Sequence, residues 1–412
     1  MVLLAVLLCA QAQQSVLTVG DGETYSRIEA ALAAAKAFDT IQVYPSSAGY
    51  GQTALRVTKP GVVIVGMGAS RIKIDGTGYD YTGAGSVPRA IFQVEPKAKG
   101  VQIRHFELTG AHNDSYNGAG VRINQASNVT VEDCDIHGND MGIMSNGTQG
   151  DAQAASNQVI THCVIHGNGN AADPGYNHNL YLGGTSVTVE FCEIYGSLTG
   201  HNLKSRAHYN LVRYCYIHDS ANRECDFPEA WDTQRPNSNA VLIGDVIVKD
   251  PNCPGNRETI HFGVESGSRN GTLYLVNDTI VTPFLSGVVA LSTSTGSASF
   301  QNSVVVNTVQ NAPNLLDLSN GGLAASASGR NNWISRQYDL SATHIDSGTR
   351  YAGGSNSTNP LDSTYRLLGQ SYATVKPTWV DGLGLAQSGY PTWIYSGNGT
   401  WKASSGPFIG AG

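Results

Sequence analysis

The stretch that decides the fold is VTVEDCDIHG at residues 129–138, which recurs as VITHCVIHG at 159–167 and as VTVEFCEIYG at 187–196. Each copy contains a three-residue mark that ends on an aliphatic residue. The marks are Phe106–Leu108, Cys134–Ile136, Cys163–Ile165, Cys192–Ile194, Cys215–Ile217, Asp245–Ile247, Asp278–Ile280, Asn302–Val304 and Asn332–Ile334. Their last residues advance by 28, 29, 29, 23, 30, 33, 24 and 30 positions. Such periods indicate stacked structural units, and the alternation of apolar residues in each copy predicts β-strands.

A second predicted strand lies between consecutive marks. These strands are Gly120–Ile123, Gly142–Ser145, His178–Tyr181, His201–Lys204, Cys225–Pro228, Ile260–Gly263 and Val288–Leu291. One such strand per repeat is what a parallel β-helix requires, because each coil buries little by itself and stacking creates the core. The sequence therefore predicts an all-β protein, a single-stranded right-handed parallel β-helix.

The N-terminal part predicts a cap for the open end of this β-helix. Thr24 is expected to cap a helix over Tyr25–Ala37, and the strand opening DTIQVYP follows at residues 39–45. This helix-then-strand opening, with the repeat after it, resembles the pectin-lyase-like superfamily. The resemblance extends over roughly residues 15 to 335. It implies a β-helix with a short capping α-helix and an activity similar to that of β-helical polysaccharide lyases.

The chain divides into four predicted segments. They are a signal peptide (1–12), an N-terminal cap (13–45), the β-helix (46–340) and irregular C-terminal coils that close it (341–412). The signal peptide is inferred from the apolar run that reaches Cys9 and from the small-x-small site Ala10-Gln11-Ala12. No later stretch approaches the ~20 apolar residues of a membrane span. We therefore expect a monomer that is secreted or periplasmic.

The composition of the chain argues against one class of binding partner. Charged residues make up 14% of the chain and the formal net charge is −7, so a nucleic-acid binder is not expected. Glycine supplies 48 of 412 residues, which suits short strands joined by tight turns.

Two rows of repeated side chains accompany the marks. The first row holds Cys134, Cys163, Cys192 and Cys215, which should stack inside the β-helix at ~4.8 Å. Phe, Asp and Asn occupy the same position in other coils, so we interpret these cysteines as packed thiols and not as a metal site. The second row holds His137, His166, Tyr195 and His218, and we interpret it as structural or solvent-facing. Cys225 and Cys253 lie outside the first row, and export leaves a disulfide between them open.

The candidate site lies on two adjacent coils that read NHNLYLG at 177–183 and GHNLKSR at 200–206. His178 and His201 are 23 residues apart, one coil, so equivalent residues of the two coils should stack. Strand alternation places the leucines inward. The residues predicted to point outward are Asn179, Tyr181, Asn202, Lys204 and Arg206. The same parity turns His178 and His201 inward, where they either brace the strands or, if a twist frees them, take part in catalysis.

This face suggests chemistry on an acidic sugar chain. β-Elimination of a uronate requires a cation to neutralise the carboxylate and a base that removes the proton at C5. Lys204 is the predicted base, because the like charge of Arg206 disfavours its protonated form. Arg206 neutralises the substrate carboxylate, and Tyr181 is the predicted proton donor. His201 completes the catalytic set.

Neighbouring coils add further predicted contacts. The substrate-binding residues are predicted to be His178, Asn179, Asn202, Arg122 and His261. Three carboxylates, Glu224, Asp226 and Glu265, are expected to face outward, where they could bind Ca²⁺ through oxygen.

The leading hypothesis is thus a polysaccharide lyase acting on a uronate-containing polymer. Three alternatives stay open. One is a glycoside hydrolase that uses Asp226 and Glu224 as its pair of carboxylates. The others are a C5-epimerase and a non-catalytic, glycan-binding surface protein.

Overall fold

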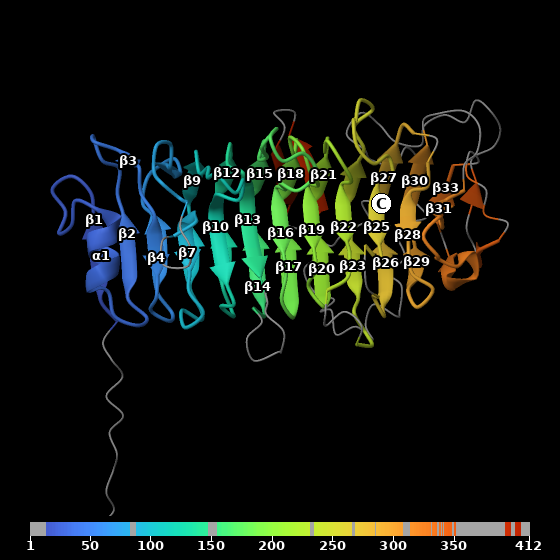
Figure 1. The fold of residues 1–412 in the computed structure, drawn as a ribbon, viewed down its shortest axis with the longest axis horizontal. Helices are drawn as coiled ribbons and strands as arrows, with labels where there is room; N and C mark the ends of the chain where they lie inside the picture. The colour runs from blue at the N-terminus through green and yellow to red at the C-terminus, as the bar shows by residue number, and fades with distance from the viewer. Residues whose placement is uncertain are drawn as a thin grey trace, which may run out of the picture.

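The chain folds into a column of stacked coils. The computed structural model describes residues 14–82, 88–146, 155–230, 235–265, 268–284, 286–307 and 314–330. Beyond these it describes 332–335, 338, 340, 342–347, 350–351, 392–396 and 400–404. Figure 1 shows the coils side by side along one long axis, from α1 (Ile28–Ala34) at the blue end to β33 (Trp333–Ile334) near the orange end.

Three parallel sheets run the length of this column. Sheet A contains β1 (Val16–Val19), β2 (Thr40–Val43), β5 (Val63–Gly66), β8 (Gln102–Arg104), β11 (Thr130–Glu132), β14 (Gln158–Thr161), β17 (Ser186–Glu190), β20 (Tyr209–Arg213), β23 (Ala240–Ile243), β26 (Thr272–Val276), β29 (Ser297–Gln301), β32 (Ala327–Arg330) and β34 (His344–Ser347). Sheet B contains β3 (Tyr50–Gly51), β6 (Ile72–Asp75), β9 (Phe106–Thr109), β12 (Asp135–His137), β15 (Val164–His166), β18 (Glu193–Tyr195), β21 (Tyr216–His218), β24 (Val246–Val248), β27 (Thr279–Thr282), β30 (Val304–Asn307), β33 and β35 (Arg350–Tyr351). Sheet C contains β4 (Leu55–Val57), β7 (Ala90–Val94), β10 (Ala119–Asn124), β13 (Met141–Asn146), β16 (Leu180–Leu182), β19 (Leu203–Ser205), β22 (Cys225–Phe227), β25 (Ile260–Phe262), β28 (Val289–Leu291) and β31 (Leu316–Asp317). The predicted parallel β-helix is confirmed.

The repeated marks form sheet B. Ile136 pairs with Ile165, and Ile165 pairs with Ile194, as the repeat predicts. One mark is displaced by a residue, because Ile280 pairs with Val305 and not with Val304. Residues 304–306 are all valine, so alternation could not phase this strand. The second set of predicted strands forms sheet C.

A single residue turns the chain from sheet A to sheet B. It has a positive φ in eight successive coils: His105, Asp133, His162, Phe191, Tyr214, Gly244, Asn277 and Asn302. Few non-glycine residues adopt this left-handed conformation. Its repetition makes each corner the same length, so the strands of sheets A and B keep their register from coil to coil.

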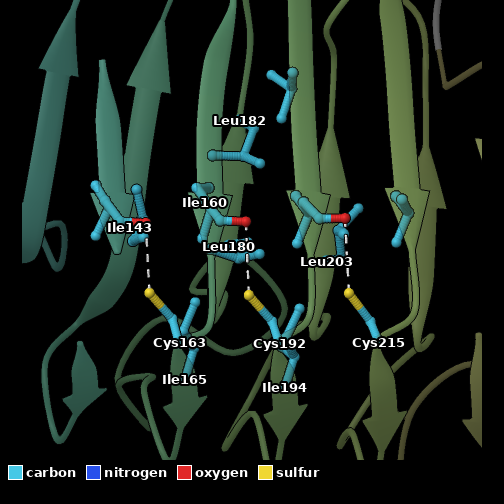
Figure 2. Packing of buried hydrophobic residues seen from close by; sticks show 14 of the residues in the cluster. Ile143, Ile160, Cys163, Ile165, Leu180, Leu182, Cys192, Ile194, Leu203 and Cys215 are labelled. Atoms are coloured by element: carbon cyan, nitrogen blue, oxygen red, sulfur yellow. Dashed lines mark hydrogen bonds between the residues drawn. The ribbon is translucent and has the colours of Figure 1, made fainter. Parts of the chain in front are cut away.

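The position directly after this corner points into the core. Cys134, Cys163, Cys192 and Cys215 occupy it, and all four are buried free thiols. Each thiol donates to a carbonyl of the preceding coil, at 3.6 Å from Cys192 Sγ to the Ile160 oxygen, for example (Figure 2). The predicted internal row of packed cysteines is confirmed. Cys225 and Cys253 are also free, so the structure contains no disulfide between them.

The histidine row lies on the outer face of sheet B. His137, His166, Tyr195 and His218 stack in order with ring-centroid distances of 5.0, 4.7 and 5.0 Å. Neighbouring carboxylates hold them, such as Asp135 at 3.2 Å from His166 Nε2. The row is therefore structural, one of the two interpretations made from the sequence.

The capping helix is shorter than predicted. Helix α1 begins at Ile28, and its N-cap residue Arg27 makes no side-chain capping bond. Thr24 does not cap, because the segment before the helix pairs with β1. The Tyr25 amide donates to the Thr18 carbonyl at 3.0 Å. Ile28 and Ala31 still bury the apolar face of the helix against the first coils.

The ends of the β-helix also differ from the predicted boundaries. Strands of the coil start at Val16, well before residue 46, and β35 continues sheet B to Tyr351. Strands β36 (Thr392–Ser396) and β37 (Thr400–Ser404) pair antiparallel as a separate sheet. The predicted signal peptide and most of the predicted closing coils lie outside the described residues.

In two later coils, Asp245 and Asp278 occupy the inward-facing position that the cysteines hold in earlier coils. Other occupants donate from it to a carbonyl of the preceding coil, as Asn332 Nδ2 does to the Phe300 oxygen at 2.9 Å. A carboxylate has no proton to donate, but a carboxylic acid has one. Burial raises the pKa of Asp245 to about 8. Burial and then the charge of Asp245 raise the pKa of Asp278 well above its usual value. The raised pKa values of Asp245 and Asp278 favour the protonated form of both side chains in the folded protein.

The Asp245→Asn variant tests this protonation. The pKa of Asp245 is higher in the folded chain than in the unfolded chain. Its contribution to stability is therefore full at low pH and is lost as the pH rises through about 8. Asparagine keeps the oxygen that accepts from the Cys215 amide at 2.7 Å and adds a donor. We expect the Tm of the variant to exceed that of the parent at pH 8 by at least ~2 °C.

The gain should shrink toward pH 5, where the parent acid is already protonated. Thermal melts followed by circular dichroism across this range measure it. Exposed Asp114 offers the matched control, since Asp114→Asn should leave the profile unchanged. A gain that is as large at pH 5 as at pH 8 would contradict a buried acid at position 245.

Candidate functional site

The outer face of sheet C carries one side chain from each coil in a continuous row. Register pairing joins Arg122 to Met144, Met144 to Tyr181, Tyr181 to Lys204, Lys204 to Asp226, and Asp226 to His261. We call this the outer row. Leu180 and Leu203 point into the core, so the predicted outward direction of Tyr181 and Lys204 is confirmed.

Lys204, in the outer row, forms ion pairs with two carboxylates. Its Nζ lies 2.6 Å from Glu265 Oε1 and 3.2 Å from Asp226 Oδ2. Burial favours the neutral amine, but these two carboxylates outweigh it and raise the pKa of Lys204 above its usual value. The lowered pKa predicted for Lys204 is therefore wrong. The two acids, and not Arg206, dominate its surroundings.

Arg206 shares the same carboxylate. Its Nη2 pairs with Glu265 Oε2, and its Nε donates to the Tyr181 hydroxyl oxygen at 3.2 Å. Burial raises and the Lys204 ammonium lowers the pKa of Glu265, with a net decrease, so Glu265 is ionised. The Glu265 side chain is 38% exposed, against 10% for Lys204. One exposed carboxylate therefore bridges two cations at the mouth of the site.

Asp226 lies beneath this bridge and is fully buried. Its Oδ1 is 2.6 Å from His261 Nδ1, and its Oδ2 is 3.3 Å from His201 Nε2. Burial raises its pKa, but His201, His261 and Lys204 outweigh burial and hold the pKa well below its usual value. Asp226 is a buried anion that fixes the positions of the groups around it.

A hydrogen-bonded chain continues from Asp226 through His261 to Ser292. His261 Nε2 lies 2.5 Å from Ser292 Oγ, and that oxygen also accepts the Val264 amide at 2.9 Å. The linkage is that of an acid–histidine–serine triad. However, His261 and Ser292 are each only 3% exposed, so neither offers a surface to a polymer. We interpret this chain as support for Asp226. Ser292 was not predicted, and no repeated pattern marked it.

His178 and His201 lie on the outer side of the coil, contrary to the predicted inward direction. Their rings stack at 5.0 Å, and the His178 ring meets the Tyr181 ring edge-on at 5.3 Å. The Nδ1 atom of each accepts a backbone amide of the next coil, at 3.0 Å from His201 and 3.1 Å from Arg223. Burial lowers the pKa of His201 to about 4 and that of His178 well below its usual value. Both are neutral rings that brace adjacent coils.

Asn179, Asn202 and Glu224 point inward, so their predicted outward direction is wrong. Asn139, Asn168, Asn179 and Asn202 donate side chain to side chain along the corner between sheets B and C, and the last bond runs from Asn202 Nδ2 to Glu224 Oε2 at 2.6 Å. All of these residues are fully buried. The bend of the chain at this corner reverses the alternation that holds within β16 and β19. The recurrence of His-Gly-Asn at 137–139 and 166–168 was the signal for this asparagine ladder.

The three carboxylates predicted to bind calcium do not form one site. Glu224 lies inside the coil, where burial raises its pKa to about 7. Asp226 is on the other side of the strand and is occupied by Lys204 and two histidines. Across the described ranges, no group of three or more His, Cys, Asp or Glu side chains is arranged to hold a metal. These residues do not fit a calcium ion.

The structural comparisons agree with the fold. The structure of pectate lyase Pel9A superposes with a TM-score of 0.53 at 14% identity, covering 97% of this chain and 96% of that one. ORF18 of Geobacillus virus E2 gives a TM-score of 0.50 at 13% identity, covering 79% of this chain and 58% of ORF18. The pectin methylesterase PemA of Erwinia chrysanthemi gives 0.39 at 10% identity over 72% of this chain and 91% of PemA. No protein-family model matches the sequence, and no curated protein matches it.

The chain thus has the right-handed parallel β-helix fold of the pectin-lyase-like proteins. At these identities the likeness concerns the fold, and activity must be argued from the site. In the part of the chain that the structure describes, no helix has the length and apolar character needed to cross a bilayer.

The paired variants Asp226→Asn and Glu265→Gln separate the buried from the exposed partner of Lys204. Loss of the Asp226 charge leaves the Lys204 ammonium largely buried without its inner counter-ion, and we expect a cost of about 3–5 kcal/mol in unfolding free energy. Loss of the Glu265 charge, at the mouth, should cost about 1 kcal/mol or less. Chemical denaturation followed by tryptophan fluorescence compares the two. Equal costs would show that Asp226 does not organise the site.

Proposed function

We propose that this protein is a polysaccharide lyase that cleaves a uronate-containing polymer by β-elimination. The observation that carries the proposal is the Glu265 bridge. The site holds a carboxylate between Lys204 and Arg206, at its most exposed point. A substrate carboxylate has the same charge and shape, so it can take the place of Glu265 on the two cations.

The surroundings of Tyr181 and Lys204 favour roles that differ from those predicted from the sequence. Tyr181 acts as the base in its phenolate form, which the hydrogen bond from Arg206 Nε to its oxygen stabilises, and it takes the proton from C5 to become the neutral phenol. Lys204, held as an ammonium, donates a proton to the leaving oxygen. The C5–H and C4–O bonds break, a C4–C5 double bond forms, and Arg206 neutralises the uronate carboxylate.

Register supports this division of work. Tyr181 and Lys204 are paired neighbours on β16 and β19, so their side chains leave the sheet about 4.8 Å apart. A base and an acid at that separation can reach C5 and the adjoining glycosidic oxygen of one sugar. The pair of carboxylates required for the hydrolase alternative is less well placed, since Glu224 faces inward and Asp226 is fully buried.

A polymer panel tests the proposal. The protein is mixed with alginate, pectate, hyaluronan and glucuronan, with calcium or with a chelator, and absorbance of unsaturated products is followed. We expect product from at least one acidic polymer in both conditions, because Lys204 and Arg206 supply the positive charge. No unsaturated product from any of the four polymers, or new reducing ends without unsaturation, would overturn a lyase.

Substitutions in the candidate site test the proposed roles. Tyr181→Phe removes one hydroxyl and should lower kcat by about 10²–10⁴-fold, with little change in KM. Arg206→Lys should raise KM because it loses the planar fork that binds a carboxylate. Arg213 pairs with Glu190 on sheet A in a similar way, and Arg213→Lys is the matched control that should retain full activity. A fully active Tyr181→Phe variant would remove Tyr181 from the chemistry.

A further inference from the structure

Arg122 stands apart from the other cations of sheet C. It lies in β10 on the outer row, separated from Lys204 by Met144 and Tyr181. Three strand spacings therefore lie between Arg122 and Lys204, or ~14 Å along the axis of the β-helix. Both cations project from the same face of the same sheet.

The contacts of Arg122 lack an acid. Its Nε donates to Asn124 Oδ1 at 3.2 Å, and its Nη1 lies 3.3 Å from Met144 Sδ. An amide oxygen and a thioether are neutral, and sulfur is a weak acceptor. Among the described residues, no carboxylate forms an ion pair with Arg122. Lys204 and Arg206, by contrast, each form an ion pair with Glu265.

The surroundings of Arg122 make an acidic ligand favourable. Burial lowers its pKa first, and the charge of Arg89 nearby lowers it further. A half-buried guanidinium next to a second arginine is therefore held in an environment that disfavours its charge. A bound anion relieves both effects, and a guanidinium fork binds a carboxylate through two parallel hydrogen bonds.

An apolar surface joins Arg122 to the catalytic cations. Met144 and Tyr181 are partly buried and pack against a small cluster on the outer face formed by Ala90, Ala119 and Met141. The C–H face of a sugar ring can cover such a surface and remove it from water. The outer row thus presents Arg122, then the apolar surface of Met144 and Tyr181, and then Lys204, which shares Glu265 with Arg206.

We propose that Arg122 is a second carboxylate subsite and that the ligand is a linear polyuronate lying along the β-helix axis. One uronate carboxylate binds Lys204 and Arg206, sugar rings cover Tyr181 and Met144, and a carboxylate farther along the chain binds Arg122. This inference rests on the proposed function. It adds that the site recognises a run of several acidic sugars and not a single uronate at a chain end.

Affinity for oligouronates of graded length tests the subsite. Di- to hexasaccharides from alginate, pectate, hyaluronan and glucuronan are titrated calorimetrically into Tyr181→Phe protein, in which turnover is expected to be about 10²–10⁴-fold slower. We expect affinity to rise with length until the ligand spans both sites. Arg122→Met in the same background should abolish the gain, a loss of about tenfold for the hexasaccharide, and leave disaccharide affinity unchanged.

Two further variants and one ligand complete the design. Arg122→Lys keeps the charge without the fork and should retain part of the gain, which also covers the case that Arg122→Met folds poorly. Arg213→Met, on sheet A, should bind every ligand as the parent does. Hexasaccharides whose carboxyl groups are reduced to alcohols should bind weakly.

The outcomes separate this inference from the proposed function. Hexasaccharide binding that requires Arg206 but is unaffected by Arg122→Met and Arg122→Lys would overturn the second subsite and leave the lyase intact. Equal affinity for reduced and acidic hexasaccharides would overturn the subsite as well. An absence of binding by every oligouronate would overturn both.

Discussion

Parallel pairing in register along sheet C is the constraint on which the site depends. Tyr181, Lys204 and Asp226 lie on strands that pair through backbone hydrogen bonds, so the points at which their side chains leave the sheet stay one strand spacing apart. Ionisable groups held one strand spacing apart on a largely dry surface must neutralise one another. The buried Asp226 carboxylate forms an ion pair with Lys204 on its inner side, and the more exposed Glu265 carboxylate forms one on its outer side. The buried charges of Asp226 and Lys204 are thus neutralised, and Glu265 carries the more exposed charge of this group.

The repeat predicted the architecture because each coil obeys the same two rules, alternation within a strand and a fixed corner between strands. Alternation correctly placed Tyr181 and Lys204 outward and the leucines between them inward. It failed where the chain bends, since Asn179 and Asn202 belong to the corner and turn into the coil. It also failed at residues 304–306, because three consecutive valines do not indicate which of them points into the core. Side chains alternate between the two faces within a strand, but this alternation does not predict the backbone angles where the strand ends.

The charge state of the site could not be predicted from local sequence. Arg206 is two residues from Lys204 and suggested a lowered pKa, but Asp226 on the next coil and Glu265, which is 61 residues away, together raise it. The inward direction of Glu224 likewise follows from the asparagine ladder that it terminates. Both interactions depend on which coils are neighbours and on how far a loop reaches over them. A correct prediction of the fold is therefore compatible with an incorrect prediction of the pKa shift at Lys204.

The constant rise of the coils has a consequence for how such a protein can change its ligand. Because Arg122 and Lys204 sit on one sheet, their separation is a whole number of coils. Duplication or loss of one coil between them would alter that distance by a single fixed step while the core above and below it stayed the same. Distance along the surface is thus an integer quantity in this fold. On the function proposed above, gene rearrangements that add or remove one repeat would fit the two ends of the site to a different polymer spacing without redesigning either end.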